Sequence, residues 1–115
     1  MSQKSEIQEV IKEYEKKNKG KYNLNIGQYH KFLSLCELAD ILCDEFEIEE
    51  VDIQVEPSSG FGTVCLEADE VVFENGRRHE FFRLIQSSDY LRFAKSKNGA
   101  IEIHFGVKEL WLRCE

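Results

Sequence analysis

The chain has 115 residues, of which 42% are hydrophobic and 32% are charged, and its net charge is −7. This length and balance predict a single α+β domain over residues 1–115 with one modest core, and they exclude a disordered chain. The first twenty residues are dense in Lys and Glu, and no stretch approaches the roughly 20 apolar residues that span a bilayer. We therefore expect a cytoplasmic protein without a targeting segment or membrane anchor.

The first predicted element is a helix that begins near Ser5 and stops at Gly20. Ser5 and Gln8 have the spacing of a capping box, and Gly20 can take the left-handed conformation that ends a helix. Apolar residues at helical spacing form one narrow stripe along it: Ile7, Val10, Ile11 and Tyr14.

A second helix is predicted from Gln28 to Phe46, after a connector over residues 21–27. Its apolar stripe is too wide for a surface helix, which predicts the central helix of the core, with the sheet on one side and the first helix on the other. The stripe consists of Phe32, Leu33, Leu35, Cys36, Leu38, Ala39, Ile41, Leu42, Cys43 and Phe46.

Beyond residue 50 the apolar period changes to two, which predicts strands. Val51, Ile53 and Val55 alternate with polar residues, a loop follows over 57–62, and residues 63–68 and 71–74 have strand patterns. Residues 77–87 fit either a strand or a short helix, and we favour the helix because Asn75 is a fair N-cap.

The C-terminal third is predicted to hold a hairpin around Asn98-Gly99, with strands over 90–96 and 100–105. A two-residue turn there pairs Lys95 with Glu102, whose opposite charges support that register. His104 is expected to point away from the core, and Trp111 to pack in the core or at an edge. The whole pattern predicts two N-terminal helices packed on a mainly antiparallel sheet of four or five strands, with a third short helix.

The charge is unevenly distributed along the chain. Residues 23–76 hold thirteen acidic residues and one Lys, whereas the segments on either side carry a net positive charge. Acidic residues near the C-terminal end of the second helix lie at the negative pole of its dipole, which costs a few tenths of a kcal/mol each. This block predicts a docking face for a basic protein partner: Asp40, Asp44, Glu45, Glu47, Glu49 and Glu50. Solubility, or pairing with the basic C-terminal third, explains the block equally well.

Specific catalytic and metal chemistry finds little support in the sequence. The chain has four cysteines: Cys36, Cys43, Cys65 and Cys114. No two of them have the Cys-x-x-Cys spacing of a zinc site, so we expect free thiols rather than a zinc site or disulfides. The acidic run lacks the glycine of a calcium loop, and the three histidines are scattered without a nucleophile motif. The sequence therefore predicts no enzyme, no metal and no other cofactor.

These features together predict a small binding protein that neutralises or regulates a basic protein partner. In size and charge the chain is similar to immunity proteins of bacterial toxin systems, a resemblance of general character rather than of sequence. Its acidity disfavours nucleic acid and anionic lipid as partners. Two alternatives remain open: a subunit of a homo-oligomer or larger assembly that uses a sheet edge or the Trp111 segment, and a small ligand-binding domain or enzyme with a polar pocket.

Overall fold

A computed structural model describes residues 3–46, 48–68, 86–95 and 99–114. They form α1 (Gln3–Lys17), β1 (Tyr22–Leu24), α2 (Ile26–Phe46), β2 (Glu49–Glu56), β3 (Phe61–Ala68), β4 (Tyr90–Lys95), β5 (Ile101–Val107) and β6 (Trp111–Arg113). Four strands make an antiparallel sheet in the order β2-β3-β5-β4, and β1 pairs with β6 in a separate two-stranded sheet. The predicted α+β class, with two N-terminal helices and an antiparallel sheet, is confirmed.

Two predicted elements lie outside the described residues. They are the strand at 71–74 and the short helix or strand at 77–87, of which only Gln86 and Ser87 are described, as helical residues. Neither described helix combines the length and the apolar character needed to cross a membrane.

The first helix begins earlier than the sequence predicts. α1 starts at Gln3, so Ser5 lies inside the helix and the predicted capping box is wrong. At the other end the helix stops at Lys17, before the predicted Gly20, and Gly20 takes its left-handed φ of 85° in the turn that follows. The side-chain amide of Asn18 donates to the Tyr14 carbonyl at 3.0 Å and so satisfies one of the carbonyls that the helix end leaves free.

The predicted connector at 21–27 contains β1 and the first two residues of α2. α2 begins at Ile26 rather than Gln28, and the side-chain oxygen Oδ1 of Asn25 accepts a bond from the Gln28 backbone N–H at 3.4 Å, which makes Asn25 the N-cap. β1 is short and has no local signal, because its pairing partner is β6 at the far end of the chain. The Asn25 backbone N–H also donates to the Leu110 carbonyl at 2.9 Å, which joins the start of α2 to the C-terminal segment.

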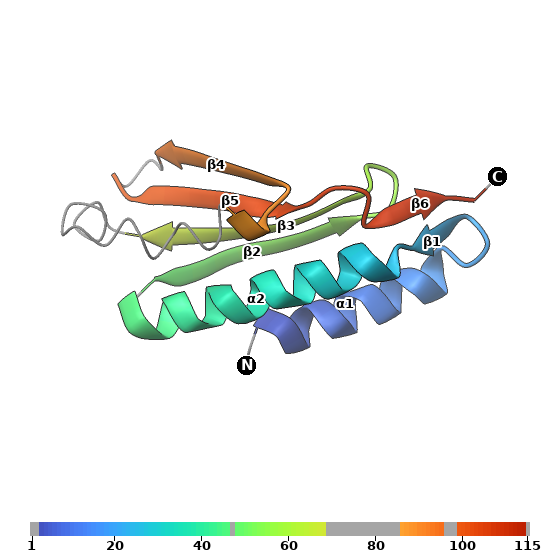
Figure 1. The fold of residues 1–115 in the computed structure, drawn as a ribbon, viewed down its shortest axis with the longest axis horizontal. Helices are drawn as coiled ribbons and strands as arrows, with labels where there is room; N and C mark the ends of the chain where they lie inside the picture. Colours follow the sequence, from blue (N-terminus) through green and yellow to red (C-terminus); the bar gives the residue numbers. More distant parts are fainter. Residues whose placement is uncertain (1–2, 47, 69–85, 96–98, 115) are drawn as a thin grey trace.

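The core lies between the two helices and one face of the four-stranded sheet. Figure 1 shows α1 and α2 side by side along that face, and α2 contacts both α1 and β5, as expected for the central helix. Trp111 is 3% exposed and belongs to the same core, which confirms its predicted packing role. Fully buried side chains come from both helices and from the inner strands: Ile7, Phe32, Leu35, Val64, Leu66, Ile103 and Phe105.

The hairpin of β4 and β5 is present, but its predicted register is wrong by one residue. Lys95 pairs with Ile101, whereas a two-residue turn would pair it with Glu102. The observed pairing leaves an odd number of residues in the connection, and Gly99 takes a φ of 82°, which suits a longer loop ending in glycine. This register puts Leu91 on the helix-covered face, where it packs against the core. Burial of that side chain outweighs one exposed charge pair.

Candidate functional site

The C-terminal half of α2 carries acidic side chains around one exposed apolar residue. Ile41 is 51% exposed, although it belongs to a helix that supplies much of the core. Residues three and four positions away on a helix are surface neighbours, so Glu37, Asp44 and Glu45 surround it. Together with the half-buried Asp40 they form what we call the α2 acidic face: Glu37, Asp40, Ile41, Asp44 and Glu45.

The six predicted partner-binding residues do not all lie on this face. Asp40, Asp44 and Glu45 belong to it. Glu49 pairs with Glu67 across β2 and β3 and is therefore directed to the opposite side of the sheet. Glu47 and the side chain of Glu50 lie outside the described part of the chain. The acidic block thus divides between the helix layer and the open sheet face.

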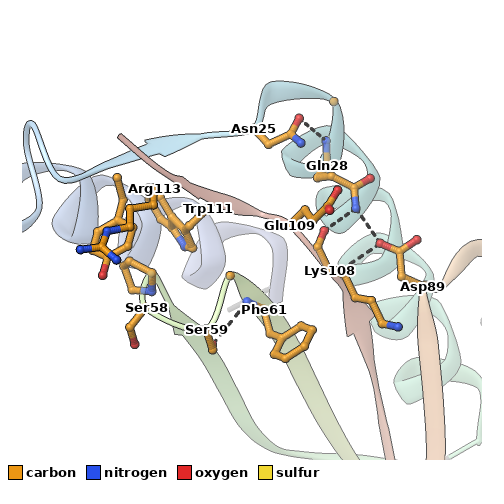
Figure 2. A pocket seen from close by; sticks show the side chains of 14 residues that line it. Asn25, Gln28, Ser58, Ser59, Phe61, Asp89, Lys108, Glu109, Trp111 and Arg113 are labelled. Atoms are coloured by element: carbon orange, nitrogen blue, oxygen red, sulfur yellow. Dashed lines mark hydrogen bonds between the residues drawn. The ribbon is translucent and has the colours of Figure 1, made fainter. Parts of the chain in front are cut away.

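A cavity of about 910 Å³ lies at one end of the molecule, where α2 begins (Figure 2). Its walls come from the start of α2, the β2–β3 turn and the segment that leads into β6. Polar side chains line it, among them Asn25, Gln28, Ser59, Asp89 before β4, and Arg113 of β6.

Asp89 links three of the segments around this cavity. Its carboxylate accepts bonds from the Gln28 side chain at 2.6 Å and from the Lys108 backbone N–H at 2.9 Å, and it forms an ion pair with Lys31. Burial alone raises the pKa of a carboxyl group, but these donors outweigh it and hold the pKa of Asp89 below its usual value. The cluster is therefore a charged structural junction whose polar groups satisfy one another.

The same cavity contains a buried donor. Trp111 Nε1 is buried and has no hydrogen-bond partner among the described residues. The β2–β3 turn is joined to the segment before Trp111 by a backbone bond, since the Leu110 N–H donates to the Gly60 carbonyl at 2.7 Å. Glu109, beside it, has a left-handed φ of 54°, which is uncommon for a residue with a side chain. The indole N–H of Trp111 is thus buried rather than open to a ligand, while the Asp89 carboxylate and the Gln28 side-chain amide bond each other.

The face of the four-stranded sheet that points away from the helices carries ordered polar rows. On β3, Val64 and Leu66 are directed to the core and are fully buried, so Cys65 and Glu67 are directed to the other face. Strand pairing places one residue of each strand side by side in the order Asp52, Cys65, His104 and Arg92. The adjacent row is Glu49, Glu67 and Glu102.

Three of these side chains meet beneath a second cavity, of about 630 Å³. The ligand-type atoms of Cys65, Glu102 and His104 all lie within 4.8 Å of one another. Cys65 Sγ is 3.6 Å from His104 Nε2, and Glu102 Oε2 is 4.0 Å from the same nitrogen. Both neighbours thus approach one nitrogen atom and converge on a common point. We call these three residues the Cys–Glu–His cluster.

The electrostatics of the cluster disfavour a nucleophilic role for the thiol. Burial, together with the nearby carboxylates of Glu102, Asp52 and Glu67, raises the pKa of Cys65 to about 11. A nucleophilic cysteine needs a lowered pKa and a histidine whose second nitrogen is held by an orienting group. Here the carboxylate and the thiol share one nitrogen, so the arrangement does not form a Cys–His–Glu relay.

No local sequence pattern indicates this cluster, because Cys65 lies far from Glu102 and His104 along the chain. His104 was expected to point outward, and it does, but its cysteine neighbour is brought there only by the pairing of β3 with β5. The chain matches no protein-family model, no curated protein and no solved structure. Its function is therefore inferred from the geometry.

Proposed function

We propose that the protein binds a basic protein partner through the α2 acidic face and thereby neutralises or regulates that partner. The observation that carries the proposal is an exposed isoleucine surrounded by carboxylates on consecutive turns of one helix. Ile41 provides an apolar anchor with 51% of its surface exposed, and Asp44 and Glu45 provide charge beside it. A central apolar contact with a polar rim is the usual organisation of a protein interface.

The acidic face opposes the local preferences of the helix that carries it. The last turn of α2 contains no basic residue, although the negative pole of the helix favours one. Asp40 and Asp44 are four positions apart, a like-charge spacing that costs about 0.2–0.5 kcal/mol in a helix. Asp44 and Glu45 form no ion pair within the described residues. A basic partner would relieve this repulsion, which supports a surface shaped for binding rather than for folding.

The charge also selects the class of partner. Clustered carboxylates attract a basic protein surface, accelerate its association and repel phosphate-rich nucleic acid. In this respect the chain is similar in character to small acidic proteins that cap a toxin or another basic enzyme. No chemistry at the α2 acidic face is needed for such a role.

The proposal is tested by charge reversal on the exposed face. The partner is first co-purified with the wild-type chain from the cell that makes it, and its affinity is then measured with both proteins purified. Asp44→Lys combined with Glu45→Lys should weaken binding at least tenfold at low salt and reduce its salt dependence. Ile41→Ser alone should weaken binding at every salt concentration.

Matched controls lie elsewhere on the helices. Glu13→Lys with Glu15→Lys makes the same charge change on the exposed side of α1, and Ile26→Ser removes an isoleucine that is 59% exposed at the other end of α2. Both controls should bind like the wild type. Equal losses in the controls and the α2 variants, or an acidic partner, would overturn the proposal.

A further inference from the structure

The Cys–Glu–His cluster has the composition of a transition-metal site. Cys65 supplies a sulfur ligand, His104 an imidazole nitrogen and Glu102 a carboxylate oxygen, and all three are held on paired strands. Zn²⁺ is bound in proteins by these three donor types, whereas Ca²⁺ and Mg²⁺ prefer oxygen ligands alone. The donor set therefore favours a borderline-soft divalent cation over a hard one.

The spacing of the donor atoms suits tetrahedral coordination. A sulfur and a nitrogen bound to one zinc ion at ordinary bond lengths lie roughly 3.6 Å apart when they subtend the tetrahedral angle. The separation of Cys65 Sγ and His104 Nε2 is 3.6 Å, and that of Glu102 Oε2 and the same nitrogen is 4.0 Å. The second separation is longer than that of a nitrogen and an oxygen bound to one zinc ion, so the Glu102 carboxylate has to move toward His104 for all three donors to reach one ion.

Strand pairing places like charges next to this cluster. Glu49, Glu67 and Glu102 lie directly opposite one another on three adjacent strands. Like charges opposite each other destabilise a sheet, and positions on an exposed face need not be acidic for the fold to form. A bound divalent cation would offset this repulsion, which is an observation independent of the donor geometry.

The site also has space for a further ligand. Cys65, Glu102 and His104 all line the cavity of about 630 Å³ on the open sheet face. Asp52 on β2 lies directly opposite Cys65, and its carboxylate accepts a hydrogen bond of 2.8 Å from the side-chain amide of Gln54. The fourth coordination position thus faces the cavity, where water or an oxygen donor from a bound molecule can occupy it.

We propose that Cys65, Glu102 and His104 form a binding site for a divalent transition metal, with Zn²⁺ as the best-fitting ion and one coordination position open to the cavity. The site lies on the sheet face opposite the helices and is separate from the α2 acidic face. Its occupancy would couple the two inner strands of the sheet through a metal bridge.

The test uses the full-length, tag-free chain after removal of metal with a chelator. Zn²⁺ affinity is measured by competition with a chromophoric chelator, and Co²⁺ is used as a spectroscopic probe. One equivalent of either ion should bind, and Co²⁺ should produce a thiolate-to-cobalt absorption band with tetrahedral visible bands. Ca²⁺ and Mg²⁺ should not compete for the site.

Variants of the three ligands should each have a distinct effect. His104→Gln should weaken Zn²⁺ binding at least tenfold, and Cys65→Ser should abolish the thiolate-to-cobalt band. His30→Gln and Cys114→Ser change the same residue types away from the cluster and should bind both ions like the wild type. The Asp44→Lys, Glu45→Lys variant should also retain Zn²⁺ binding, which separates this proposal from the proposed function.

Glu102→Gln keeps the inference testable if the Cys65 variant does not fold. It removes one of three adjacent carboxylates, so it should raise the melting temperature of the metal-free protein while weakening Zn²⁺ binding at least tenfold. A residue with only a structural role would not move these two quantities in opposite directions. Absence of stoichiometric Zn²⁺ binding, or equal affinity in the ligand variants and the controls, would overturn the assignment.

Discussion

The two faces of the four-stranded sheet come from the same strands but differ in the kind of side chain they bring together. On the helix-covered face, Leu66, Ile103 and Phe105 are fully buried and apolar, and their burial favours the fold. On the open face, residues from the same strands bring like charges together around a cysteine and a histidine. The covered face explains why the chain folds, whereas the open face holds an arrangement that folding does not require. Such local conflict is expected where a protein has a function to perform.

The largest expected effect comes from comparing two neighbouring residues of β5, one on each face of the sheet. Phe105 is fully buried on the covered face, so Phe105→Ala should destabilise the protein by about 3–5 kcal/mol through lost burial and a cavity. His104 lies on the open face, and in the metal-free protein His104→Gln should change stability by no more than about 0.5 kcal/mol. Urea denaturation of both variants measures the difference. Similar losses at the two positions would show that the open face is also part of the stabilising core.

The polar cluster around Asp89, whose groups are hydrogen-bonded to one another, should stabilise the fold, unlike the acidic row on the open face. Asp89 accepts bonds from α2 and from the segment after β5, so Asp89→Asn should destabilise the protein by about 1 kcal/mol at neutral pH, a value reduced by its partial exposure.

The pH dependence follows from the direction of the Asp89 shift. Its pKa is lower in the folded state than the ordinary value of 3.8, so the stabilisation is present at neutral pH. This stabilisation is lost as the pH falls from 3.8, the ordinary pKa, through the lower pKa of Asp89 in the folded state. Unfolding measured between pH 7 and pH 2 should therefore show the wild type and Asp89→Asn converging in acid. Glu13→Gln, on exposed α1, provides the control, and a constant difference at all pH values would contradict this explanation.

The elements that local patterns define were predictable from sequence. The 3.6-residue period and the central position of α2 follow from its wide apolar stripe, and β2 and β3 follow from two-residue alternation and burial. The turn after α1 was predictable because glycine at position 20 is one of the few residues that tolerate a φ of 85°. These features depend on near neighbours in the chain.

Features that depend on distant partners were not predictable. β1 exists because β6 pairs with it, and the start of α2 at Ile26 depends on a cap at Asn25 whose backbone is held by Leu110. The predicted hairpin register is wrong because it assumes a two-residue turn at Asn98-Gly99, whereas the observed pairing of Lys95 with Ile101 leaves a longer connection. The Cys–Glu–His cluster, like β1, depends on strand pairing between distant segments. The pairing of β3 with β5 brings Cys65 next to His104, which lies far from it in the sequence.

The smallest expected effect gives the sharpest comparison between folding and function on the open face. Glu67 lies between Glu49 and Glu102, so Glu67→Gln should stabilise the metal-free protein by about 0.2–0.5 kcal/mol at low salt, because two like-charge contacts are removed. The gain should shrink in high salt, where the charges are screened.

Glu15→Gln on α1 removes the same charge at an exposed site and should change stability less. With Zn²⁺ bound the gain should fall or change sign, since the carboxylate then faces a cation. A loss of stability in metal-free Glu67→Gln at all salt concentrations would mean that the acidic row is held by bonds within the fold, and the open face would then follow the same rules as the core.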